Sequence, residues 1–117
     1  FYINENSTTN SIVNRQGTAI EVQGITIADL IAQQGLAHVD FIKCDIEGSE
    51  MTALTNETVG AVKDVVDFWF VEIHQTDVDS APWPGNLETN RQKLKQIFED
   101  NGYDTDVVIH DQLFAWK

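Results

Sequence analysis

The order of elements expected along the chain predicts an α/β fold whose sheet contains parallel strands. From residue 39 onward, the hydrophobic and turn patterns indicate strand, helix, strand, helix, strand and strand. Each strand–helix–strand unit predicts two parallel strands, because the crossover returns the chain to the same end of the sheet. The last two strands, "DTDVVIH" and "LFAWK", are joined by a tight turn at Asp111–Gln112, which predicts a terminal antiparallel hairpin. A length of 117 residues is typical of one domain.

Composition narrows the possible functions before any motif is considered. Nineteen acidic residues against seven basic ones give a net charge of −12, which argues against nucleic acid and anionic lipid as partners. No apolar run approaches the length of about 18 residues that a membrane span needs. The single cysteine, Cys44, excludes an internal disulfide framework and a multi-cysteine zinc site. It fits a reducing compartment, and we therefore expect a cytoplasmic protein.

Residues 1–25 are expected to form short strands or a hairpin. Residues 1–4 are typical of a strand, and residues 11–13 and 18–23 of two more strands around a turn at 14–17. A helix is predicted to begin after Thr26, whose side chain caps it with Asp29 three residues on. Gly35 is expected to end this helix, which opens the larger segment 26–117 of strand–helix–strand units and the terminal hairpin.

Two strands are predicted with most support, at residues 39–46 and 65–74. The second contains "DFWFVEIH", a nearly continuous apolar run typical of a strand covered on both faces. Between the two strands we expect a short helix at 49–56 and a further helical turn at 58–63.

After a long loop at 75–86, Thr89 and Gln92 have the spacing of a capping box for a helix that runs to about Asn101. Leu94, Ile97 and Phe98 are expected to form the buried stripe of this helix. Gly102 is expected to end it.

Charged side chains gather where the two best-supported strands end. Lys43, Asp45 and Glu47 lie at the end of the first strand, and Glu72 and His74 at the end of the second. Side chains alternate along a strand, and neighbouring strands lie roughly 4.8 Å apart, so these groups are expected at one rim of the sheet. Ligands bind at the carboxyl ends of strands in open α/β sheets.

The spacing leaves two interpretations of this rim open. The functional one is a polar site: a general base, a cofactor anchor, or ligands for Mg²⁺ or Mn²⁺ from Asp45, Glu72 and His74. The structural one is an ion network in which Lys43 neutralises Asp45 or Glu72. Clustered acids are costly to bury unless they are paired, protonated or bound to a cation.

The residues next to these charged groups are expected to have structural rather than catalytic roles. Gly48 is interpreted as a tight strand-to-helix turn, and Cys44 as a buried, inert thiol. Ser49 and Glu50 are interpreted as a helix cap and a first-turn acid rather than as catalytic groups.

The stretch "VDFIKCDIEGSEMTAL" resembles the signature of FkbM-type methyltransferases. The matching positions are Val39, Asp40, Lys43, Asp45, Glu47, Gly48, Ser49 and Glu50. Upstream, "GITIADLI" is similar to the family's helix start, although Ile27 and Ala28 stand where Leu and Asp are usual. Downstream, "WFVEIH" and "NGYDTDVV" resemble later family segments, so the resemblance covers about residue 11 to the end.

The resemblance implies a Rossmann-like, mainly parallel sheet and an enzyme that uses S-adenosylmethionine (SAM) to methylate a hydroxyl of a sugar or secondary metabolite. It implies that Asp45 and Glu47 contact the cofactor and that Asp45, Glu72 and His74 surround the methyl-transfer centre. Lys43 would orient Asp45, and Gly48 would let the chain turn beside it. Positioning the hydroxyl and removing its proton would supply most of the catalysis.

The sequence departs from the family where the cofactor is usually held. It contains neither the glycine-rich turn after the first strand nor the acid that ends the second, so it resembles the C-terminal portion of the domain, incomplete for SAM binding. The strand at 39–46 then lacks a neighbour on one edge, which is an aggregation hazard. We expect residues 1–23, a missing N-terminal part or a second copy to cover it. The alternative function is a non-catalytic oligomerisation module with an acidic, metal-binding rim.

Overall fold

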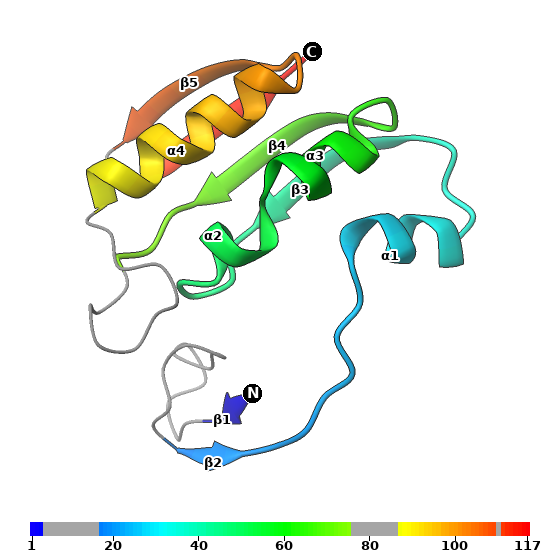
Figure 1. The fold of residues 1–117 in the computed structure, drawn as a ribbon, viewed down its shortest axis with the longest axis vertical. Helices are drawn as coiled ribbons and strands as arrows, with labels where there is room; N and C mark the ends of the chain where they lie inside the picture. The colour runs from blue at the N-terminus through cyan, green and yellow to red at the C-terminus, as the bar shows by residue number, and fades with distance from the viewer. Residues whose placement is uncertain (4–16, 76–86, 110) are drawn as a thin grey trace.

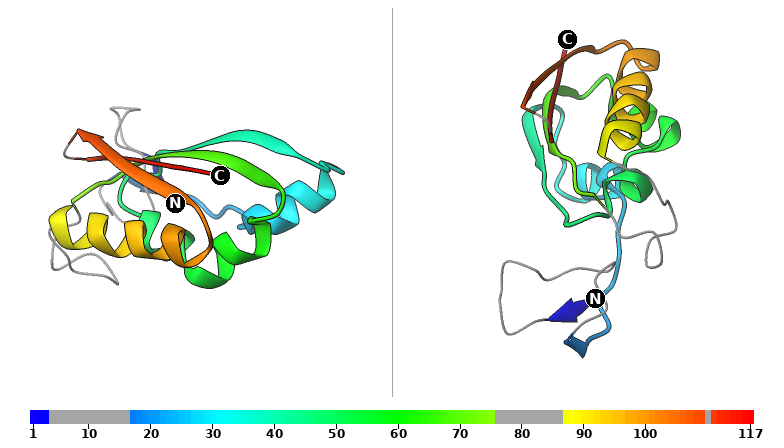
Figure 2. Two further views of the ribbon diagram at one scale, coloured as in Figure 1. Left: turned by 90° about the horizontal axis from the view of Figure 1, so that it is seen from above. Right: turned by 90° about the vertical axis from the view of Figure 1, so that its left-hand side faces the viewer.

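A four-stranded sheet with helices on one face dominates the computed structural model, which describes residues 1–3, 17–75, 87–109 and 111–117 (Figure 1). The strands, in the order β3-β4-β6-β5 across the sheet, are β3 (Val39–Cys44), β4 (Val66–Glu72), β6 (Gln112–Trp116) and β5 (Asp104–Ile109). The helices are α1 (Ile27–Gln33), α2 (Glu50–Ala53), α3 (Asn56–Val62) and α4 (Leu87–Asp100). Figure 2 shows them on the same side of the sheet.

The sheet is mixed, which corrects the prediction of a mainly parallel one. β3 and β4 are parallel, but β6 is antiparallel to both β4 and β5. The reason lies in the terminal hairpin, which the sequence predicted and the structure confirms. Its second strand inserts between β4 and β5 rather than at the edge, so both of its pairings are antiparallel. β5 consequently runs in the same direction as β3 and β4.

The first residues form a separate two-stranded sheet. β1 (Tyr2–Ile3) pairs antiparallel with β2 (Thr18–Ala19), and this pair lies away from the main sheet in Figure 1. β2 is shorter than the predicted strand at 18–23, and the strand expected at 11–13 lies outside the described residues. Among the described strands none pairs with the outer edge of β3. The expectation that residues 1–23 cover this edge is therefore wrong for the part of the chain that is described.

Side-chain caps set where two of the described helices, α1 and α3, begin. The predicted cap of α1 is confirmed, since Thr26 Oγ1 accepts from the backbone N–H of Asp29 at 3.0 Å. The helix predicted at 49–56 is broken after four residues, because Thr55 caps a new helix, α3, through a reciprocal pair of bonds with Thr58. The helical turn expected at 58–63 is thus part of a longer helix.

Helix α4 begins at Leu87, two residues before the predicted capping residue Thr89, so the capping-box prediction is wrong. The side chain of Gln92 instead donates to Glu88 Oε1 at 2.8 Å, within the helix. The end of the helix is as predicted: Gly102 adopts φ +84°, a left-handed conformation common after helix C-termini.

The core lies between the sheet and the helices. Trp69 of β4 and Leu113 of β6 are fully buried, as are Leu94 and Phe98 of α4. The rings of Trp69 and Phe98 have centroids 5.5 Å apart. The Tyr103 hydroxyl donates to the backbone oxygen of Val66 at 2.7 Å. This contact ties the chain after α4 to the beginning of β4.

The opposite face of the sheet is open and aromatic. Phe41 of β3 is 53% exposed, and Phe68, Phe70 and Phe114 are half-buried. Ring centroids are 5.6 Å apart between Phe41 and Phe68, and 4.9 Å apart between Phe70 and Phe114. We call these four residues the aromatic face. The prediction that β4 is covered on both faces is wrong, because the described helices pack on the other side (Figure 2).

None of the described helices combines the length and the apolar character needed to cross a membrane.

Candidate active site

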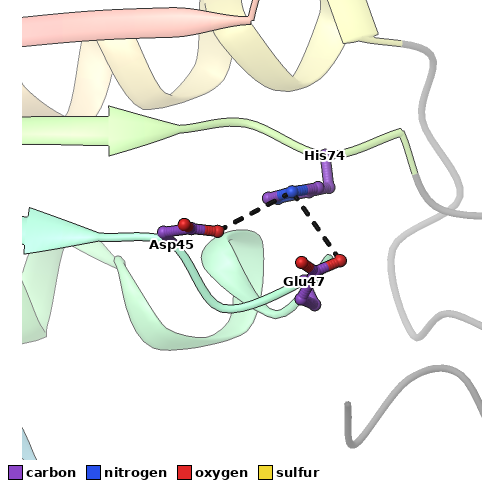
Figure 3. Close-up of side chains that lie close together, drawn as sticks. All are labelled: Asp45, Glu47 and His74. Atoms are coloured by element: carbon purple, nitrogen blue, oxygen red, sulfur yellow. Dashed lines mark ion pairs between the residues drawn. The ribbon is translucent and has the colours of Figure 1, made fainter. Parts of the chain in front are cut away.

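The parallel pairing of β3 and β4 brings the ends of these strands to one edge of the sheet. Lys43 pairs with Phe70 and Cys44 with Val71. The segments that follow the two strands therefore start next to each other at the same edge of the sheet. Nε2 of His74 lies 3.8 Å from Asp45 Oδ1 and 3.8 Å from Glu47 Oε2. Figure 3 shows the two carboxylates facing the imidazole from the chain after β3. The structure thus brings together three of the residues that the sequence singled out.

Lys43 lies between Asp45 and Glu72 and contacts both carboxylates. Its Nζ donates to Asp45 Oδ2 at 2.7 Å and lies 3.8 Å from Glu72 Oε2. The hydrogen bond to Asp45 raises the pKa of Lys43. Glu72 therefore reaches this cluster through Lys43, and an ion network of the kind predicted surrounds Asp45.

The chain turns sharply directly after β3. Glu47 has φ +54° and Gly48 has φ +95°, so two successive residues adopt left-handed conformations. Gly48 confirms the predicted tight turn. A non-glycine residue in this region is strained, and such strain is concentrated at functional sites. The turn directs the Glu47 carboxylate towards His74 (Figure 3).

Glu50 is the residue that sequence reasoning undervalued. It does lie in the first turn of α2, but its side chain is 1% exposed, and its Oε1 accepts from the backbone N–H groups of Ile46 and Gly48, each at 3.2 Å. The same oxygen lies 3.0 Å from His74 Nδ1. The available signal was its position two residues after Gly48, from which a carboxylate can reach back to free N–H groups at a helix start. Ser49 makes no side-chain cap bond, contrary to expectation.

Burial and charge shift two further pKa values in this region, those of His74 and Cys44. Burial of His74 acts to lower its pKa, but the hydrogen bond to Glu50 and the charges of Glu50, Glu47 and Asp45 outweigh it, so the pKa is raised. Burial raises the pKa of the Cys44 thiol to about 12, which keeps it protonated at neutral pH. The prediction of a buried, unreactive Cys44 agrees with this environment.

A pocket of about 450 Å³ opens beside the two carboxylates. Most of its surface is apolar, with Phe1, Ile46 and Ala53 among the lining residues, and Asp45, Glu47 and Ser49 also line it. Such a volume lies in the range of small-molecule sites. A second pocket, of about 390 Å³, lies among residues of α2, α3 and α4, including Met51, Leu54 and Ile97.

A divalent cation has one candidate donor set in the described part of the chain. It comprises Asp45, Glu47 and His74, whose donor atoms all lie within 4.8 Å of one another. The predicted set had Glu72 in place of Glu47. The structure places Glu72 beside Lys43, whereas the left-handed turn brings Glu47 to the imidazole.

The chain was compared with protein families, curated proteins and solved structures. A family model described as "Methyltransferase FkbM domain" matches residues 2–105. No curated protein and no solved structure matches the chain.

Proposed function

The chain belongs to the FkbM methyltransferase family, and from this premise we propose that it transfers a methyl group from SAM to a hydroxyl of a sugar or secondary metabolite. The observation that carries the proposal is the meeting of Asp45, Glu47 and His74, because Asp45 and Glu47 also line the pocket of about 450 Å³. We propose further that the β3-β4-β6-β5 sheet is the C-terminal part of a Rossmann-like domain. The three strands in one direction and the reversed β6 support this.

The residues at the pocket fit the proposed cofactor. SAM supplies an electrophilic methyl group on a positively charged sulfonium. The carboxylates of Asp45 and Glu47 favour positive charge, and the apolar surface of Ile46 and Ala53 suits the flat face of the adenine ring. Asp45 and Glu47 are therefore the residues that would hold it.

His74 is the proposed base for the acceptor hydroxyl. In its neutral form it takes the hydroxyl proton, and the carboxylates 3.8 Å from Nε2 stabilise the resulting imidazolium. Lys43 holds Asp45 in place through a 2.7 Å hydrogen bond, and Glu72 contributes through Lys43. Positioning the hydroxyl supplies the remaining rate enhancement.

Methyl transfer is tested by incubating the chain with SAM and a panel of hydroxylated sugars and polyketides. The expected products are S-adenosylhomocysteine and an acceptor that has gained one CH₂, detected by mass spectrometry. His74→Asn should remove most of this product, whereas the matched control His38→Asn, at the opposite end of the sheet, should retain it. Equal turnover by the two variants would contradict the role of His74.

Asp45, Glu47 and His74 are also proposed to bind Mg²⁺ or Mn²⁺, if the reaction uses a metal. The mutual proximity of their donor atoms supports this. Either ion should raise the melting temperature of the wild type, and Asp45→Asn with His74→Ala should abolish the rise. A rise that survives both substitutions would mean that the ion binds elsewhere.

We also propose a cytoplasmic location, which the single cysteine supports.

A second candidate function, self-association, is favoured by the aromatic face and the outer edge of β3. Phe41 lies on both features and is 53% exposed. We propose that a second copy of the chain pairs there, because exposed strand edges are templates for further pairing. Sedimentation should show a dimer that Phe41→Ser weakens and that Val108→Ser, at a 62% exposed position of β5, does not. A wild type that stays monomeric at all concentrations would exclude this candidate.

A further inference from the structure

We propose that Glu50 is a positioning residue that fixes both the tautomer of His74 and the turn between β3 and α2. No substrate needs to touch it for this role. The chemical use of the resulting His74 Nε2 rests on the proposed function, but the tautomer and the turn do not.

The distances around His74 decide where its proton lies. Nδ1 is 3.0 Å from Glu50 Oε1, within hydrogen-bond reach, whereas Nε2 is 3.8 Å from both Asp45 and Glu47. A carboxylate that already accepts two backbone N–H bonds can only accept from Nδ1 as well. The neutral imidazole therefore carries its proton on Nδ1 and presents its lone pair on Nε2.

The same oxygen of Glu50 also shapes the turn. It accepts from Ile46 and Gly48, the residues on either side of the strained Glu47. A buried charge is costly unless it is hydrogen-bonded, and three N–H donors on one oxygen supply that compensation. A neutral amide oxygen has no net charge, so its hydrogen bonds to the same donors are weaker than those of a carboxylate oxygen. The position consequently requires a carboxylate rather than any side chain of similar shape.

Glu50 thereby couples the two chain segments that form the candidate site. One set of bonds holds the segment after β3, which carries Asp45 and Glu47, and another holds His74 after β4. The Nε2 lone pair lies on the side of Asp45 and Glu47, where it can accept a proton or bind a cation. In both cases a carboxylate on the other ring nitrogen raises the basicity of the imidazole.

The tautomer is measured directly by ¹⁵N NMR of the histidine rings in the wild-type chain, above the pKa of His74. We expect a protonated-type signal at Nδ1 and a lone-pair-type signal at Nε2 of His74. His38 is the internal reference with the opposite expectation, since its Nε2 faces Asp40 at 3.3 Å and Asp67 at 3.4 Å. A wild-type His74 with its proton on Nε2 would overturn the proposal, and this measurement needs neither SAM nor an acceptor.

The variant Glu50→Gln tests whether the carboxylate is the cause. We expect a loss of the Nδ1–H population of His74 and displaced amide signals for Ile46 and Gly48. Glu57→Gln, which removes an exposed acid from the first turn of α3, should leave all three unchanged. Wild-type-like ring and amide signals in Glu50→Gln would overturn the proposal. If Glu50→Gln does not fold, the ¹⁵N NMR measurement of the His74 tautomer in the wild type tests the proposal by itself.

Discussion

The carboxylate of Asp45 and the imidazole of His74 face each other across the ends of two parallel strands, with Oδ1 and Nε2 3.8 Å apart (Figure 3). The two residues are brought together by the sheet, because the register of β3 and β4 aligns Cys44 with Val71. On the other side of the ring, Glu50 Oε1 lies 3.0 Å from His74 Nδ1 and orients the imidazole. The chemistry proposed for the chain depends on this relationship.

The pH dependence of stability should report the raised pKa of His74. The hydrogen bond to Glu50 and the nearby charges of Glu50, Glu47 and Asp45 favour the charged imidazolium of the folded state over the opposing effect of burial. A raised folded-state pKa contributes stability fully below the unfolded-state pKa of about 6.5, and this contribution is lost as the pH rises through the folded-state value.

The measurement is the free energy of unfolding in denaturant at a series of pH values. The wild type should lose stability relative to His74→Asn from about pH 6.5 upward. Parallel curves for the two proteins would contradict the predicted linkage.

Gly48→Ala should destabilise the turn after β3. Gly48 has φ +95°, and a Cβ in left-handed conformations costs about 1–2 kcal/mol. Gly24→Ala is the matched control, because no heavy atom lies within 4 Å of the position of its added Cβ. Chemical denaturation should show a loss for the first variant and little change for the second. Equal stabilities would mean that the left-handed turn is not required.

Phe98→Ala tests the packing of α4 on the sheet. Phe98 is fully buried and its ring contacts those of Trp69 and Tyr103. Its removal should lower the free energy of unfolding by about 3–5 kcal/mol. Val108→Ala, at a position 62% exposed, should stay within about 0.5 kcal/mol of the wild type. A small effect at Phe98 would indicate that α4 contributes little to the core.

Local patterns predicted most elements of the fold. The cap at Thr26, the strands around Phe41 and Trp69 and the helix end at Gly102 all follow from rules that act over a few residues. The insertion of β6 between β4 and β5 is a long-range choice, and no local pattern distinguishes it from a hairpin added at the sheet edge. The open aromatic face was missed for a similar reason, since an apolar run does not reveal how many layers cover it.

The candidate site was predictable in outline but not in its connections. Alternation along two strands was enough to place Asp45 near His74. The pairing of His74 with Glu50 was not predictable, because it depends on the left-handed turn at Glu47 and Gly48. Helix-terminus preferences favoured the role of a first-turn acid for Glu50. Only the fold shows that α2 turns this carboxylate inward.

Titration of the ¹⁵N-labelled chain with SAM, followed by amide NMR, tests most directly whether Asp45, Glu47 and His74 form a methyltransferase site. Because the sequence lacks the glycine-rich turn and the acid that usually hold SAM, we expect weak binding: shifts that saturate only at millimolar SAM and are centred on residues 45–49 and His74. Asp45→Asn should weaken the binding further, whereas Asp104→Asn, on distant β5, should not. An absence of shifts at millimolar SAM would contradict the proposed site. Shifts confined to the pocket around Met51 and Ile97 would contradict it equally.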